Sequence, residues 1–123
     1  MDAVQKTIMV VDDEEDVRNT VQTTLKIDGY KVITAENGDE CLKKLPRQKI
    51  DLILLDIMMP GKPVEDVIKS IRQTKIILLS VVRKEEAVRE RLMRSKNVVG
   101  YIEKPFEIDD LLNKVRQAVK GRQ

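Results

Sequence analysis

The sequence predicts an α/β protein in which a five-stranded parallel sheet carries helices on both faces. Five short apolar segments, rich in Val, Ile and Leu, recur every 19 to 25 residues. Amphipathic segments with helical spacing separate them. Strands that alternate with helices are typical of parallel sheets, because each connection between parallel strands must cross a face of the sheet.

The predicted strands follow one another at regular intervals. They are "TIMVVD" from Thr7, "KVITA" from Lys31, "IDLILLD" from Ile50, "KIILLS" from Lys75 and "VVGYI" from Val98. Three of these runs are almost continuously apolar, which is typical of strands buried on both faces.

Each predicted helix carries an apolar stripe at helical spacing. In chain order the stripes are Val17, Val21 and Leu25; Cys41, Leu42 and Leu45; Val64, Val67, Ile68 and Ile71; Val88 and Leu92; and Ile108, Leu111, Leu112, Val115 and Val119. Gly29 and Pro46 supply stop signals for the first two helices. The fourth stripe is the weakest, because its helix is highly charged.

Composition limits the class of protein. The chain has 123 residues, which predicts a single domain over residues 1–123. A net charge of +2 is too small to indicate direct binding of nucleic acid. The apolar runs are far shorter than the roughly 20 residues of a membrane span, and no secretory signal begins the chain. Cys41 is the sole cysteine, so we expect a cytoplasmic protein without disulfides.

The sequence contains no histidine. This excludes Ser-His-Asp and Cys-His catalysis, and it excludes metal sites built on histidine. Any chemistry therefore depends on carboxylates, hydroxyls, lysines and a hard cation.

Suitable side chains follow the predicted strands. Asp12 and Asp13 end the first strand, Asp56 the third and Ser80 the fourth, while Lys104 follows the fifth. Because the carboxyl ends of parallel strands meet at one edge, these residues are expected to converge. Three carboxylates suit Mg²⁺, and an aspartate can act as a nucleophile toward phosphorus.

Each of these residues also has a simpler interpretation. Acidic residues just after a strand often lie in the first turn of the next helix, where the helix dipole stabilises negative charge. We assign this role to Glu14, Glu15 and Asp16, and it stays an alternative for Asp12 and Asp13. An aspartate that ends a strand is often only a cap or turn residue, which leaves the same alternative for Asp56. The remaining alternatives are a helix cap at Ser80, a solvated loop lysine at Lys104 and simple packing at Tyr101.

Four stretches resemble the receiver domain of two-component response regulators over almost the whole chain: "VVDDEEDVR", "DLILLDIMMPG", "IILLS" and "YIEKPF". The resemblance implies a flavodoxin-like, doubly wound (βα)5 fold with strand order 2-1-3-4-5. It further implies that Asp56 is the phosphoacceptor and that Asp12 and Asp13 hold Mg²⁺ with the backbone carbonyl of Met58. Ser80 and Lys104 would contact the phosphoryl group, and Tyr101 would be the rotating aromatic of the switch.

The same resemblance implies partners. The phosphoryl donor would be a phosphohistidine on a sensor histidine kinase or phosphotransfer protein, and the output a downstream protein effector. The protein would catalyse only its own phosphorylation and dephosphorylation. One helix follows "EKPF", so we expect a stand-alone receiver. An acidic partner is one expectation for the basic segment Arg83, Lys84, Arg89, Arg91 and Arg94; a solvated face is the other.

Three features depart from the family pattern. Pro63 and Val64 replace the usual Asp-Gly pair, Val81 is bulkier than the usual residue, and "SKNVVGY" adds about two residues before Lys104. We therefore expect an altered fourth helix and fifth strand. The runner-up function is a Mg²⁺-dependent phosphohydrolase of the haloacid-dehalogenase type, disfavoured because Met58 stands where that family has a second aspartate. A receiver without phosphorylation is disfavoured because every key residue type is present.

Overall fold

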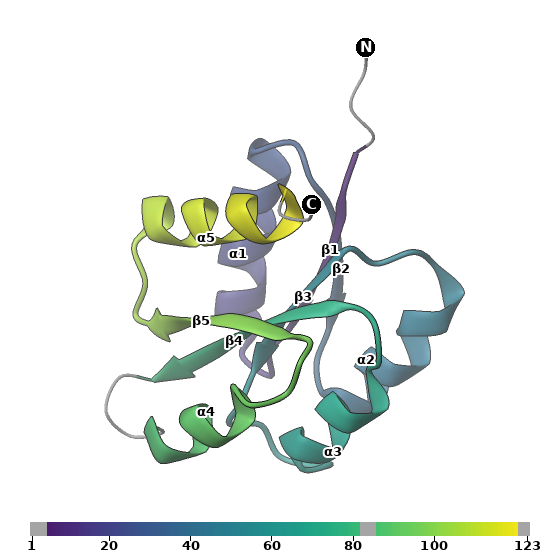
Figure 1. Cartoon of the computed structure of the whole chain (residues 1–123). Helices are drawn as coiled ribbons and strands as arrows, with labels where there is room; N and C mark the ends of the chain where they lie inside the picture. Colours follow the sequence, from purple (N-terminus) through teal and green to yellow (C-terminus); the bar gives the residue numbers. More distant parts are fainter. Residues whose placement is uncertain (1–4, 82–85, 121–123) are drawn as a thin grey trace.

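The computed structural model describes residues 5–81 and 86–120. Five parallel strands form one sheet in the order β2-β1-β3-β4-β5, which confirms the predicted fold class and strand order (Figure 1). The strands are β1 (Thr7–Val11), β2 (Lys31–Ala35), β3 (Leu52–Asp56), β4 (Lys75–Val81) and β5 (Val98–Lys104).

Five α-helices cover the two faces of the sheet. They are α1 (Glu15–Ile27), α2 (Gly38–Lys44), α3 (Val64–Ser70), α4 (Glu86–Leu92) and α5 (Ile108–Lys120), and a short 3-10 helix, Leu45–Arg47, follows α2. Helices α1 and α5 lie on one face, and α2, α3 and α4 lie on the other (Figure 1). None of the helices within the described ranges has the length and apolar character that crossing a bilayer requires.

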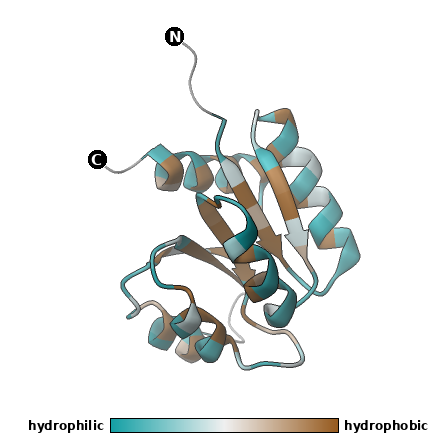
Figure 2. Cartoon of the chain, turned by 90° about the vertical axis from the view of Figure 1, so that its right-hand side faces the viewer, coloured by the Kyte–Doolittle hydropathy of each residue, from teal (hydrophilic) through white to brown (hydrophobic). Residues whose placement is uncertain are grey.

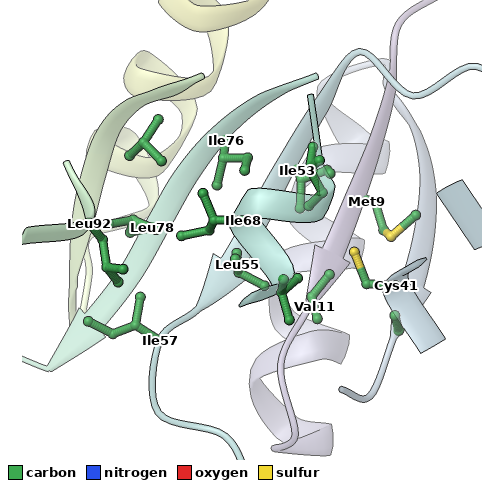
Figure 3. Close-up of a cluster of buried hydrophobic side chains, with 14 of the residues drawn as sticks. Met9, Val11, Cys41, Ile53, Leu55, Ile57, Ile68, Ile76, Leu78 and Leu92 are labelled. Atoms are coloured by element: carbon green, nitrogen blue, oxygen red, sulfur yellow. The ribbon is translucent and has the colours of Figure 1, made fainter. Parts of the chain in front are cut away.

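The central strands are buried on both faces, as their apolar runs predict. All five residues of β3 are buried, and apolar residues dominate the strands at the centre of the molecule (Figure 2). Along β1, Ile8 packs in the cluster beneath α1 and α5, whereas Met9 packs in the cluster beneath α2, α3 and α4 (Figure 3). This alternation follows from the two-residue repeat of a strand, and it makes the sheet a rigid platform for its carboxyl edge.

Local sequence explains several element boundaries. The side chain of Asn37 accepts the N–H of Glu40 at 2.8 Å and thereby caps α2. Helix α1 ends before Gly29, whose φ of 98° lies in the left-handed region that glycine tolerates. Gly38 packs so closely on α3 that a Cβ atom there would lie 2.5 Å from Cγ2 of Val67.

The edge strand β5 contains the irregularity expected from the sequence. Its register with β4 shifts between two consecutive pairs, Ile76 with Val98 and Ile77 with Gly100. A bulge of this kind inserts an extra residue into one strand and locally changes its twist. Part of the longer "SKNVVGY" segment is therefore absorbed at Val99, before β5 reaches Tyr101.

Candidate functional site

Three carboxylates meet at the carboxyl edge of the sheet. Asp12 and Asp13 directly follow β1, and Asp56 is the last residue of the neighbouring strand β3. Each offers an oxygen atom, and these oxygens all lie within 4.8 Å of one another. Asp12 and Asp56 are buried while Asp13 is exposed, so the cluster is open to solvent on one side. The predicted convergence of these residues is therefore what the structure shows.

Asp12 is held by contacts from three directions. Its Oδ1 accepts the backbone N–H of Glu14 at 2.9 Å, and its Oδ2 accepts a hydrogen bond from Nζ of Lys104 at 2.7 Å. Its backbone carbonyl accepts a hydrogen bond from the guanidinium of Arg18 at 2.7 Å. Glu15 and Asp16 occupy the first turn of α1 as expected, but Glu14 precedes that helix as its N-cap residue.

Asp56 is a buried acid with an unusual pKa. Burial raises the pKa of its carboxyl group to about 7, with a further contribution from the charge of Asp12. The N–H of Met58, 3.1 Å from Oδ1, and the ammonium of Lys104 oppose this rise in the pKa. The ionised form of Asp56 is therefore short of compensating positive charge when no cation is bound.

Lys104 places one positive charge beside the carboxylates of Asp12 and Asp56. Its Nζ lies 3.6 Å from Oδ1 of Asp56 and 3.8 Å from the carboxylate of Glu14, and its side chain is mostly buried. Burial alone would lower the pKa of Lys104, but the hydrogen bond to Asp12 and the nearby carboxylates outweigh it and raise the pKa. The alternative of a solvated loop lysine is therefore wrong.

Ser80 lies within β4, which continues to Val81, and so the strand ends one residue later than predicted. The residue is completely buried, and its hydroxyl has no hydrogen-bond partner in the part of the chain that the structure describes. It is consequently not a helix cap. A buried hydroxyl without a partner is uncommon, and it often indicates a functional position.

The ring of Tyr101, on β5, lies close to two cationic side chains. The guanidinium of Arg89 stacks on its ring at 4.0 Å from the centroid, and Nζ of Lys114 lies 5.5 Å from the same centroid. Arg89 also pairs with Glu103 at 3.0 Å. The ring packs at the border of the hydrophobic cluster beneath α4.

These contacts change the interpretation of the basic segment. Arg89 is buried, and Arg91 pairs with Glu65 at 3.0 Å, so two of its five cations belong to contacts within the fold. Arg94 is exposed, and Arg83 and Lys84 lie outside the described residues. The expectation of a solvated face is therefore wrong for Arg89, whereas the exposed Arg91 and Arg94 agree with it.

The cleft above the carboxylates has a volume of about 220 Å³. Its lining residues are Asp13, Glu14, Asp56, Met58, Val81 and Lys104. Sequence analysis missed Glu14 as a lining residue and missed Arg18 and Arg89 as structural partners. The stretch "VVDDEEDVR" contains both Glu14 and Arg18, but its spacing alone does not show which groups they reach.

Comparison with known proteins identifies the family that this architecture resembles. A family model described as the response regulator receiver domain matches residues 8–116. The Bacillus subtilis alkaline phosphatase synthesis transcriptional regulatory protein PhoP is 36% identical over 119 residues, which cover 95% of this chain and 50% of that protein. The transcriptional regulatory protein ResD of the same organism is 36% identical, with 98% of this chain and 51% of that protein covered. The chain thus spans about half the length of these curated relatives.

Solved structures give the same result. The Vibrio cholerae chemotaxis protein CheY4 superposes with a TM-score of 0.84 at 27% identity, covering 94% of this chain and 99% of that one. The response regulator TrrA of Thermotoga maritima, solved in complex with Mg(2+)-BeF, superposes with a TM-score of 0.81 at 36% identity, covering 93% of this chain and 99% of that one.

Proposed function

The chain belongs to the receiver-domain family of response regulators, and on this basis we propose that Asp56 accepts a phosphoryl group while Asp12 and Asp13 hold Mg²⁺ beside it. A receiver domain is a signalling switch, so the chemistry at Asp56 would control a binding surface. The observation that carries the proposal is the grouping of three carboxylates within 4.8 Å around a buried aspartate.

The donor set fits the cation. Mg²⁺ prefers hard oxygen ligands and retains several waters, and the three aspartates offer only oxygen. Asp12, Asp13 and Asp56 would hold the ion together with the backbone carbonyl of Met58. When bound, Mg²⁺ neutralises charge on the oxygens of a transferring phosphoryl group.

Asp56 would act as the nucleophile. Its Oδ1 accepts the N–H of Met58, and among the described residues Oδ2 has no hydrogen-bond partner, which leaves Oδ2 to attack phosphorus. The new O–P bond forms as the P–N bond of a donor phosphohistidine breaks, and the leaving imidazole keeps the bonding electrons. We propose a histidine kinase or a phosphotransfer protein as that donor.

Lys104 and Ser80 would recognise the product. Lys104 already lies within 4 Å of Asp56, so its ammonium can donate to a phosphoryl oxygen with little movement. The unpartnered hydroxyl of Ser80 can donate to another, which removes the cost of leaving a buried donor without a partner.

The response of Ser80 would reach Tyr101 through the paired strands. Ser80 pairs with Glu103, two residues beyond Tyr101 on β5. Movement of Ser80 toward the phosphoryl group would vacate space that the Tyr101 ring can enter, away from Arg89. The surface formed by α4, β5 and α5 would then change, and we propose a protein effector as its partner.

A phosphohydrolase of the haloacid-dehalogenase type is less well supported. Such an enzyme needs a second acid near the nucleophile, and Met58 stands two residues after Asp56. Met58 is 60% exposed and has no group that can donate a proton to a leaving alcohol.

Intact-mass spectrometry tests the proposal. With acetyl phosphate and Mg²⁺ the wild-type protein should gain one phosphoryl group, and the gain should be lost in EDTA and in Asp56→Asn. Rapid multiple turnover of a simple phosphate ester would instead favour the hydrolase, and an undiminished adduct in Asp56→Asn would refute the role of Asp56.

A further inference from the structure

Arg18 contacts the main chain of the acidic site, although its side chain is not among those that would touch the ion or the phosphoryl group. It lies in the first turns of α1, and only 13% of its side chain is exposed. One guanidinium nitrogen donates to the carbonyl oxygen of Asp12 at 2.7 Å. The other lies 3.9 Å from the exposed carboxylate of Glu36, too far for a hydrogen bond.

The carbonyl that Arg18 holds belongs to the peptide bond between Asp12 and Asp13. Asp12 has other anchors, because its N–H donates to Ala35 and both of its carboxylate oxygens accept hydrogen bonds. The carboxylate of Asp13 is different: it makes no hydrogen bond or ion pair with any described residue. Its direction therefore depends on the orientation of the main chain that carries it.

We propose that Arg18 is a positioning residue that holds the Asp12–Asp13 peptide so that the carboxylate of Asp13 faces the cation site. This inference rests on the proposed magnesium site. A charge-assisted hydrogen bond of 2.7 Å is strong and directional, and it is well suited to fix a peptide plane.

A purely electrostatic role for Arg18 predicts the opposite effect on metal affinity. A guanidinium near the site repels Mg²⁺, so removing its charge alone would tighten binding. Loss of a positioning contact would weaken binding. The sign of the change in Kd therefore distinguishes the two roles.

The experiment is a Mg²⁺ titration of the full chain followed by amide NMR, with thermal melts in EDTA to verify folding. Arg18→Met, which keeps the length of the side chain but removes its donors, should weaken binding about tenfold, the scale of lost support around a metal ligand. Arg18→Lys should recover most of the affinity, because its ammonium can reach the same carbonyl. Two control variants, Glu36→Gln and Arg116→Met, should change the Kd for Mg²⁺ less than about twofold. Arg116→Met is a matched control because it also removes a cation at α1, but one that pairs with Asp28, just beyond the C-terminal end of that helix.

A double-mutant cycle tests whether Arg18 acts through Asp13. In the Asp13→Asn background, Arg18→Met should cause little further loss, whereas full additivity would overturn the proposal. Unchanged or tighter binding in Arg18→Met, with normal binding by the wild type, would also overturn it and leave the magnesium site intact. If the wild type showed no saturable binding, the magnesium site and this role would both be refuted. Should Arg18→Met fail to fold, Arg18→Gln enters the same cycle.

Discussion

Replacing Asp56 with asparagine should stabilise the metal-free protein at neutral pH. The carboxyl group is buried, and its pKa is raised from 3.8 to about 7. A difference of about three in pKa, at about 1.4 kcal/mol for each unit, means that ionised Asp56 costs the folded state about 4 kcal/mol. Asparagine is nearly the same shape and carries no charge, so it removes this cost.

The pKa of about 7 already includes the attraction between Asp56 and Lys104. The net gain should be smaller, about 2 kcal/mol, because the buried amide of asparagine brings N–H donors that need partners. At roughly 4 °C per kcal/mol for a domain of this size, the melting temperature of Asp56→Asn in EDTA should rise by about 8 °C at pH 7.5. Asp13→Asn is the matched control, since it removes an exposed carboxylate from the same cluster and should give a much smaller rise.

The pH dependence follows from the direction of the pKa shift. Between pH 4 and 7 the folded protein keeps a proton on Asp56 that the unfolded chain has released, so its stability falls as the pH rises through this window. Asp56→Asn lacks this loss, and the two melting temperatures should converge near pH 4. An asparagine variant that melts at or below the wild type at pH 7.5, or keeps the same advantage at pH 4, would refute this reasoning.

Three further substitutions probe contacts around the site. Ser80→Ala removes a buried hydroxyl that has no described partner and should raise the free energy of unfolding by about 1 kcal/mol. The same variant should weaken the response of Tyr101 to beryllofluoride, a phosphoryl mimic, in amide NMR spectra. A full response would contradict the proposed coupling. Gly38→Ala should lower the free energy of unfolding, measured in urea, by about 1–3 kcal/mol, because its Cβ would lie 2.5 Å from Cγ2 of Val67. A neutral effect of Gly38→Ala, in the wild type and in Val67→Ala alike, would rule out this clash. Arg89→Met removes a stacking contact worth about 0.5–1 kcal/mol that holds the Tyr101 ring in its resting position. Because the ring then moves at lower cost, beryllofluoride should bind about threefold more tightly. Weaker binding would show that the stacking contact does not oppose the switch.

The fold class and the meeting of the carboxylates could be predicted because they depend on local patterns and on the topology of parallel strands, whereas the strand order was implied by the family resemblance. Continuous apolar runs such as β3 specify strands buried on both faces, and the topology of parallel strands places Asp12 and Asp56 at one edge. The end of β4 was misplaced by one residue, because Ser80 looks like a boundary residue in sequence but lies inside the strand.

The contacts of Arg18 and Arg89 could not be predicted, since the spacing of residues does not identify the partner of either side chain. Arg89 pairs with Glu103 across 14 positions, and nothing within the charged helix identifies that partner. Arg18 reaches a backbone carbonyl, and every residue offers a carbonyl, so spacing is uninformative. The two contacts depend on how the helices pack on the sheet, which a local pattern does not encode.

The position of the phosphoryl group tests the proposed chemistry most directly. Protein treated with acetyl phosphate and Mg²⁺ can be reduced with borohydride, which converts an aspartyl phosphate to homoserine, and then mapped by peptide mass spectrometry. We predict homoserine at position 56 alone and none when EDTA replaces Mg²⁺. Homoserine at Asp12 or Asp13, or equal conversion in EDTA, would contradict the assignment of Asp56 as the metal-assisted phosphoacceptor.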